Sequence, residues 1–313
     1  MILVTGGMGF IGLHTAHYLA SAGEKVLITR FRRSRNPEFL LPYLDSGQVQ
    51  VAAMDVSDPF SVLEAMAAHR VKSVLHLAVP ELGGVGVGRE IDVNVGGLRN
   101  VLSSAEALGI ERATMASSVA VYAGSGDGPW TEDAPLPVVS PSATSAFKKA
   151  EEILALHYAD RSGMDVSCVR IGVVYGPLYH SLSNLPSRLV HAAVRPGTEL
   201  PARPSVPGAR RDLSDLLYVR DCAAGLGLVH LAESRRRIYN LGGGQAVPDA
   251  DVAAAVSRAV PGWVAPEAGS HALDDSGSRY MDLRTVEQVG FKPRYSVDEG
   301  IADYAEWLRH HDL

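Results

Sequence analysis

Cysteine is scarce in this sequence, which has two, Cys168 and Cys222, among 313 residues. They lack the Cys-x-x-Cys spacing of zinc and redox motifs, so we expect buried free thiols and no bound metal. The sequence also has no apolar run of about 18 residues, the length that a membrane-spanning helix needs. Because Met1 leads directly into a predicted strand, no room is left for a signal peptide, and we expect a cytoplasmic protein.

Positive charge is not in excess either. The chain has 29 lysine and arginine residues against 35 aspartate and glutamate residues, a net charge of -6 and a calculated pI near 6.0. This balance argues against a nucleic-acid or anionic membrane partner. With 46% apolar and 20% charged residues, the composition is that of an ordinary globular protein with a large core. Small-molecule chemistry is therefore the expected function class.

Short apolar runs alternate with amphipathic stretches along the chain up to residue 174. This alternation predicts βαβ units and a parallel sheet with helices on both faces. The expected strands are 2–5, 25–29, 49–54, 73–78, 112–117 and 166–174, and the expected helices are 10–22, 59–69, 90–108, 145–160 and 221–232.

Proline becomes dense after residue 176, which limits 176–219 to short helices and loops. We expect residues 1–175 to form a Rossmann domain that is completed by about 221–241. Residues 176–220 and 242–313 are expected to form a smaller substrate-binding lobe. The run Arg235-Arg236-Arg237 is interpreted as the solvated end of the helix before it, complementing the helix dipole.

The most informative motif is the run Thr5-Gly6-Gly7-Met8-Gly9-Phe10-Ile11-Gly12, which follows a predicted strand and opens a predicted helix. The first glycine permits a tight turn, the second lets a pyrophosphate approach the backbone, and the third lets helix and strand pack closely. The helix N-terminus faces the phosphates. We predict that Gly6, Gly9, Phe10, Ile11 and Gly12 bind a dinucleotide, the alternative being a plain glycine-rich turn.

Arginines follow the second predicted strand, where NAD-binding proteins usually have a carboxylate for the adenosine ribose. Arg30 occupies that position, and Arg32, Arg33 and Arg35 follow closely. Positive charge at this point favours the 2′-phosphate of NADP over NAD. Two alternatives stay open: a solvated basic loop, and a site that accepts NAD as well.

Asp55 ends the third predicted strand. Its carboxylate is a candidate acceptor for the adenine amino group. It is equally a candidate cap for the helix that begins near Pro59.

Further segments of a recognisable type follow the glycine loop: His76-Leu77-Ala78, Asn94 with Gly97 and Asn100, Ser117-Ser118-Val119-Ala120-Val121-Tyr122, Val174-Tyr175-Gly176-Pro177, Tyr218-Val219-Arg220-Asp221, Tyr239-Asn240-Leu241-Gly242 and Arg279-Tyr280-Met281-Asp282. Together they make nearly the whole sequence resemble the extended short-chain dehydrogenase/reductases, which include nucleotide-sugar epimerases, dehydratases and reductases. The resemblance implies a doubly wound α/β Rossmann sheet of about seven mostly parallel strands. It also implies a homodimer that pairs through the helices at 90–108 and 145–160.

The resemblance implies roles for individual residues. Cofactor contacts fall to Arg30, Arg33, Asp55, Val56, Leu77, Ala78, Asn94 and Lys148. Ser118 matches the family's catalytic Ser/Thr, which hydrogen-bonds the reacting oxygen of the substrate, the alternative being a hydroxyl that ends a strand.

The family's Tyr-x-x-x-Lys motif is missing here. Pairing Lys148 with the family lysine puts Thr144 in the tyrosine position, whereas choosing Lys149 puts Ser145 there. Neither is a phenol, and an aliphatic hydroxyl does not ordinarily titrate in proteins, so Thr144 is expected to relay a proton rather than act as a base. Lys148 is expected to bind the nicotinamide ribose unless it is a helix-surface lysine.

Departures on the substrate side affect the expected activity. Arg279 matches a diphosphate-binding arginine, but a second one is replaced by Ser214, for which Arg210 or Arg211 are candidate substitutes. Val173 stands where relatives use an asparagine for the nucleotide-sugar. Tyr179 and His180 are candidate proton donors because relatives turn this segment toward the cofactor.

Val119 and Ala120 stand where nucleotide-sugar 4,6-dehydratases have an Asp-Glu pair, which disfavours that reaction. The expected function is an NAD(P)-dependent epimerase or oxidoreductase acting on a hydroxyl or ketone carbon of a sugar-like, nucleotide-linked substrate. Two alternatives stay open: a reductase of a non-nucleotide ketone, and a cofactor-binding sensor without hydride transfer.

Overall fold

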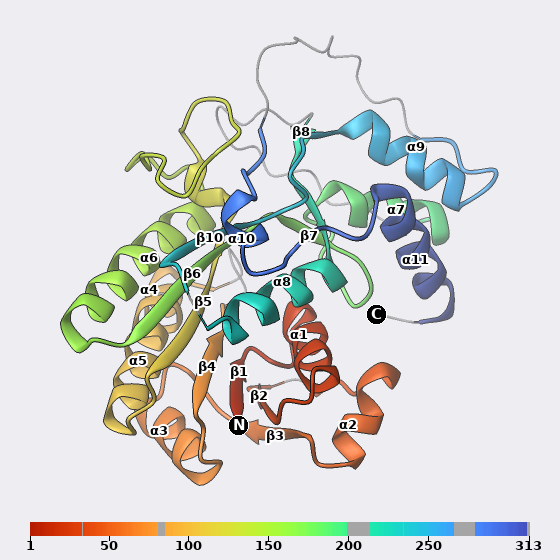
Figure 1. Cartoon of the computed structure of the whole chain (residues 1–313). Helices are drawn as coiled ribbons and strands as arrows, with labels where there is room; N and C mark the ends of the chain where they lie inside the picture. Colours follow the sequence, from red (N-terminus) through yellow and green to blue (C-terminus); the bar gives the residue numbers. More distant parts are fainter. Residues whose placement is uncertain (33, 81–84, 199–212, 234, 266–278, 312–313) are drawn as a thin grey trace.

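The computed structural model describes residues 1–32, 34–80, 85–198, 213–233, 235–265 and 279–311. Seven strands form the central sheet in the order β10-β6-β5-β4-β1-β2-β3, and every neighbouring pair in it is parallel (Figure 1). The predicted doubly wound α/β sheet is thereby confirmed. The strands are β1 (Ile2–Thr5), β2 (Val26–Arg30), β3 (Val49–Ala53), β4 (Ser73–His76), β5 (Arg112–Ser118), β6 (Asp165–Ile171) and β10 (Ile238–Leu241).

Helices cover both faces of this sheet. Helices α1 (Phe10–Ser21) and α8 (Val219–Leu231) pack together on one face, and α3 (Pro59–Ala68), α5 (Gly97–Ala107) and α6 (Ala143–Ser162) pack on the other (Figure 1). Successive strand residues point to opposite faces, so Val4 and Ile28 enter the first core while Leu3 and Leu27 enter the second. Because both faces of the inner strands are buried, these strands are mostly apolar, and buried polar side chains within them, such as Thr114, Ser167 and Arg170, are hydrogen-bonded.

The predicted strand 166–174 is wrong as a single element. The chain leaves the central sheet at Gly172, and β7 (Val173–Tyr175) pairs instead with β9 (Leu216–Tyr218). The physical reason is close backbone packing: a Cβ atom at Gly172 would lie 2.8 Å from the carbonyl oxygen of Asp215, which accepts a hydrogen bond from the Val173 amide.

The predicted helix 90–108 is also divided. It consists of α4 (Val87–Ile91), a π-helical turn (Asp92–Gly96) and α5. The Asn94 side chain donates a hydrogen bond to the Glu90 carbonyl at 2.9 Å inside this wider turn. Side chains that compete for backbone carbonyls are a known cause of such irregular turns.

A third apolar cluster lies beyond the carboxyl ends of the strands, around β7 and β9. It joins α7 (Leu185–Val194), α9 (Asp249–Ala259) and α11 (Val297–His310) (Figure 1). The shorter elements are α2 (Leu41–Asp45), α10 (Arg284–Glu287), β8 (Leu213–Ser214), β11 (Val247–Pro248) and the 3-10 turns Glu38–Leu40 and Val119–Tyr122. Among the described helices, none is long and apolar enough to cross a membrane.

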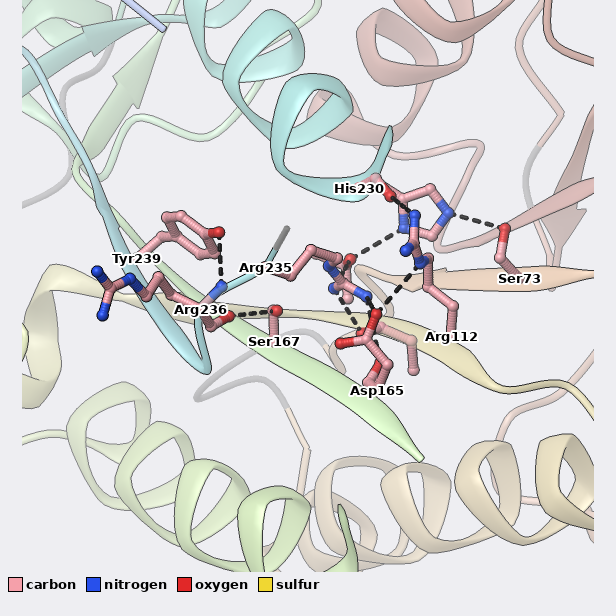
Figure 2. Close-up of polar contacts among 10 residues, drawn as sticks. Ser73, Arg112, Asp165, Ser167, His230, Arg235, Arg236 and Tyr239 are labelled. Atoms are coloured by element: carbon pink, nitrogen blue, oxygen red, sulfur yellow. Dashed lines mark hydrogen bonds and ion pairs between the residues drawn. The ribbon is translucent and has the colours of Figure 1, made fainter. Parts of the chain in front are cut away.

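Arg235 corrects the interpretation of the arginine run as a solvated helix end. Its side chain is 2% exposed and donates to the Asp165 carboxylate at 2.8 Å and to Thr114 Oγ1 at 2.8 Å. Figure 2 shows Arg112 and His230 beside it, at the amino ends of the strands. Arg235 therefore fixes the edge of the sheet opposite to the glycine loop, and only Arg236 and Arg237 are exposed.

Candidate functional site

The glycine loop has the shape that a dinucleotide requires. Gly6 has φ +66°, and a Cβ atom there would lie 2.9 Å from the backbone of Ala78. A Cβ atom at Gly12 would lie 2.4 Å from the Gly6 carbonyl oxygen. Gly9 is the N-cap of α1, provides no side-chain cap, and no acidic residue stands in the first turn. The amides at the start of α1 are thus available to a pyrophosphate, so these residues fit the cofactor.

Thr5 supports the site in a way that the sequence interpretation missed. Its Oγ1 accepts hydrogen bonds from the amides of Leu77 and Ala78 at 3.1 and 3.2 Å and contacts His76 Nδ1 at 2.7 Å. Since both acceptor positions of the hydroxyl are used, its single proton points to Nδ1, which is unprotonated. Thr5 thereby aligns the ends of β1 and β4, where Leu77 and Ala78 are predicted to meet the cofactor. The sequence signal for this role of Thr5 was its position at the head of the glycine motif.

His76 is buried and neutral. Burial, reinforced by the positive charge of Lys148, lowers the pKa of its imidazole to about 3. His76 is the last residue of β4 and lies close to Lys148 and to the glycine loop. It holds the site rather than exchanging protons at neutral pH.

Arg30 lies at the exposed carboxyl end of β2, as predicted, and Arg33 lies outside the described residues. The capping alternative for Asp55 is wrong. Asp58 caps α3 instead, accepting a hydrogen bond from the Phe60 amide at 2.9 Å. The Asp55 carboxylate accepts from the Ser57 amide and hydroxyl at 2.9 and 2.6 Å and lies 3.4 Å from Arg89 Nη2.

The other predicted cofactor residues differ in how exposed their side chains are. Phe10 packs against Tyr179 with the ring centroids 4.9 Å apart, and Ile11 is half-buried in the first core. Val56 is buried and its carbonyl accepts from Asn100 Nδ2 at 2.9 Å. Asn94 is 2% exposed and its amide group serves the π-helical turn. For Val56 and Asn94 the structure therefore gives a packing role, and cofactor contact stays a prediction.

Ser118 is the last residue of β5, at the edge of the sheet where the glycine loop also lies. Its Oγ accepts a hydrogen bond from the Ala120 amide at 3.2 Å and turns the chain into the helical turn Val119–Tyr122. The side chain is half-buried, so its hydroxyl proton remains available to a ligand. Open α/β sheets bind their ligands at this edge.

The two alternatives for the lysine motif are separated by the contacts of α6. Lys149 Nζ donates to the carbonyls of Ala123, Pro137 and Val139 at 2.5 to 3.1 Å, so its ammonium group is used to hold that loop. Ser145 is fully buried and its hydroxyl closes a capping box with Ser142. Both groups have structural partners, which favours the predicted assignment of Lys148 and Thr144 to the site.

Lys148 is buried together with a carboxylate that the sequence interpretation did not single out. Its Nζ donates to Glu151 Oε2 at 2.7 Å, and each side chain is 10% exposed. Burial raises the pKa of Glu151, although the charge of Lys148 opposes the rise. The sequence signal for this ion pair was the i, i+3 spacing of the two residues on a predicted helix. Thr144 lies one turn earlier, half-buried, and its hydroxyl makes no hydrogen bond to another described residue.

A second buried ion pair fixes α6 against the sheet. Arg170 on β6 donates to both oxygens of Glu152 at 2.8 to 3.3 Å, and Ser117 donates to the same carboxylate at 2.5 Å. Arg170 also donates to the hydroxyl of Tyr122 at 2.7 Å. This network joins β5, β6 and α6 directly behind Ser118 and Lys148, so it sets their relative position.

The candidate proton donors Tyr179 and His180 make their contacts near the start of α1. The Tyr179 hydroxyl lies 2.6 Å from Ser183 Oγ. Arg35 Nη2 lies 2.7 Å from His180 Nε2, which therefore acts as an acceptor. Neither residue has a contact with Ser118 among the described interactions.

Arg279 is half-buried, with Nε 3.7 Å from Asp127 Oδ1, and this atom has no hydrogen-bond partner among the described residues. A buried donor of this kind is costly unless a ligand satisfies it. Ser214 belongs to the short strand β8, and Val173 opens β7. Arg210 and Arg211 lie outside the described residues.

Comparison with known proteins agrees with this arrangement. Residues 2–242 match the family described as NAD dependent epimerase/dehydratase. The chain is 27% identical to dTDP-glucose 4,6-dehydratase of Streptomyces niveus, covering 98% of this chain and 92% of that protein. It is 24% identical to UDP-glucuronate 4-epimerase of Thermodesulfobacterium geofontis, covering 98% and 95%.

Solved structures show the same similarity. The crystal structure of Thermus thermophilus UDP-glucose 4-epimerase in complex with NAD superposes with a TM-score of 0.76 at 25% identity, and the match covers 99% of each chain. With the glycine loop, the parallel sheet and the match over residues 2–242, this chain is an enzyme of the NAD dependent epimerase/dehydratase family.

Proposed function

We propose that this enzyme epimerises a hydroxyl-bearing carbon of a nucleotide-linked sugar by transient oxidation. The observation that supports the proposal is the position of Ser118 at the carboxyl end of β5, on the sheet edge that also holds the glycine loop. A bound nicotinamide ring supplies the capacity to accept and return a hydride. The named relatives include epimerases and dehydratases, and Val119 and Ala120 lack the carboxylates that the dehydratases are expected to use.

Each side chain has one task in this proposal. Ser118 donates a hydrogen bond from its hydroxyl to the reacting oxygen of the substrate, and Arg279 binds a diphosphate through its guanidinium group, whose ion pair with Asp127 is long at 3.7 Å. Lys148 keeps two of its three ammonium protons for the nicotinamide ribose while the third is shared with Glu151. Thr144 relays a proton but is no base, so the substrate proton passes through it to Tyr179, His180 or water.

The test is to purify the protein, identify any nicotinamide cofactor that it retains, and follow the cofactor absorbance while nucleotide-sugars are offered. Interconversion of two sugar epimers without net cofactor consumption supports the proposal. Net oxidation of the cofactor with a simple ketone favours the reductase alternative. That alternative is motivated by Val173 and Ser214, which replace polar residues that bind the nucleotide-sugar in relatives. Tight cofactor binding without turnover of any substrate favours a sensor.

NADP is the cofactor that we propose. Arg30 ends β2, at the position where a carboxylate would favour the ribose of NAD, and its exposed side chain is suited to a 2′-phosphate. Replacing Arg30 with glutamate should weaken NADP binding far more than NAD binding. Equal affinities of the parent protein for the two cofactors would refute this argument.

A homodimer through α5 and α6 is also proposed. The outward face of α6 exposes Ile153 (69%) and Leu154 (44%), which a second copy of the helix pair would cover. Light scattering of the parent protein and of Ile153→Glu tests the pairing, since the charged variant should be monomeric. The free buried thiols of Cys168 and Cys222 suit the cytoplasmic location that we propose.

A further inference from the structure

The ends of β2 and β3 bring a carboxylate close to the arginines of the proposed NADP site. The two strands pair in parallel with Arg30 opposite Ala53, and the Met54 amide donates to the Arg30 carbonyl at 3.0 Å. Phe31 and Asp55 therefore follow the strands at the same edge of the sheet. A phosphate bound beside Arg30 lies in the field of the Asp55 charge.

Asp55 is ionised at neutral pH. Burial alone would raise its pKa, but hydrogen bonds from Ser57 and the positive charge of Arg89 together hold the pKa of this carboxyl below its usual value. Both Ser57 bonds use Oδ1, whereas Oδ2 faces Arg89. Without Arg89, the negative charge of Asp55 would have no cation to balance it, and it would lie next to the position proposed for the phosphate.

Arg89 reaches this point from α4 and is held by three different groups. Its Nη1 donates to Ser57 Oγ at 2.8 Å, its Nη2 lies 3.4 Å from Asp55 Oδ2, and its guanidinium carbon lies 5.9 Å from the centroid of Phe31. The guanidinium carbon of Arg32 lies 4.8 Å from the same ring, which is 53% exposed. An aromatic face attracts cations, so Phe31 keeps both guanidinium groups at this edge.

We infer that Arg89 is a specificity-determining residue for NADP, which it favours by cancelling the charge of Asp55 beside the 2′-phosphate. The inference rests on the proposed NADP site and extends it from the loop after β2 to α4. With Arg89 in place, the phosphate meets the arginines that follow β2 and a neutralised carboxylate. Without it, the phosphate is repelled by Asp55, while the uncharged 2′-hydroxyl of NAD is not.

The experiment is isothermal titration of the purified full chain with NADP and with NAD, so no catalytic activity is needed. Arg89→Met should lower NADP affinity about tenfold and change NAD affinity less than about twofold. Arg89→Lys, which keeps the charge, should retain most of the NADP preference. The matched control is Arg99→Met, because Arg99 is an arginine of the same helical segment, exposed where Arg89 is half-buried, and bonds to Asn100 rather than Asp55.

A rescue variant distinguishes charge cancellation from a structural role. Asp55→Asn added to Arg89→Met should restore NADP affinity, since it removes the repelling charge and keeps an amide oxygen. Failure of this rescue, or an equal loss in Arg99→Met, overturns the inference. One result separates the two proposals: the parent protein prefers NADP, Arg30→Glu abolishes this preference, and Arg89→Met leaves it unchanged. In that case NADP stands as the cofactor and only the role of Arg89 is refuted. If the parent has no preference, both fall.

Discussion

Three buried histidines should make this protein sensitive to acid. Burial lowers the pKa of His14 to about 4 and those of His76 and His230 to about 3, and nearby positive charges reinforce the effect at all three. His230 is the clearest case, since its Nδ1 lies 2.9 Å from Thr114 Oγ1 and its Nε2 lies 2.8 Å from Ser73 Oγ (Figure 2). An imidazolium there would be a buried charge beside the guanidinium groups of Arg235 and Arg112, which disfavours protonation.

The sign and size of the effect follow from proton linkage. In the unfolded chain a histidine has its ordinary pKa of 6.5, so it binds a proton as the pH falls below that value while the folded ring stays neutral. Stability is therefore lost between the unfolded pKa and the lower folded pKa. At about 1.4 kcal/mol per pH unit, acidification from about pH 7 to about pH 5 costs about 2 kcal/mol per histidine. Burial raises the pKa of Asp215 to about 6, which offsets about 1 kcal/mol of the total.

The assay is urea unfolding at both pH values, followed by circular dichroism, with ligand absent. The three histidines, less the opposing contribution of Asp215, predict a loss of about 5 kcal/mol, a large part of the stability of a typical protein. His230→Gln should remove about 2 kcal/mol of the pH dependence. The control is His69→Gln, because the His69 ring bonds to Gln50 at the surface. If His230→Gln loses as much stability on acidification as the parent, the histidine argument is refuted.

Further predictions concern single side chains. Ser118→Ala should lower kcat/KM roughly 100-fold or more and cost about 1 kcal/mol of unfolding free energy, because the Ala120 amide loses its acceptor, and an unchanged rate would contradict its assignment to the site. Lys149→Met should cost about 2 kcal/mol of unfolding free energy, measured in urea, because three carbonyls lose their donor. Arg235→Met should cost about 2 kcal/mol by the same measurement because Thr114 and the Ala113 carbonyl lose their buried donor while Asp165 keeps Arg112, whereas Arg237→Met at the surface should be near neutral.

The central fold could be predicted from the sequence because its signals are local. Strands buried on both faces are mostly apolar, and helices packed on one side are amphipathic, so both hydrophobic patterns are visible without tertiary knowledge. The glycine loop is local too, since the clashes that exclude a side chain at Gly12 involve Gly6 and Gly7 in the same turn. The predicted position of Ser118 at the end of a strand followed for the same reason.

Other features depended on partners far away in the chain. The break at Gly172 is imposed by the backbone of Asp215, and the exposure expected for Arg235 was wrong because Asp165 lies across the sheet edge. The sequence predicted Lys148 as the motif lysine but allowed Lys149 as an alternative, and the carbonyls around Lys149 argue against that alternative.

What the sequence by itself determined is the doubly wound sheet and the dinucleotide loop, because backbone sterics and hydrophobic period act over a few residues. What only the tertiary structure decided is which charges neutralise one another. Asp55 with Arg89 and Arg170 with Glu152 are examples. An ion pair depends on a separation of a few ångströms in space and on burial, and neither quantity is written in the order of the residues.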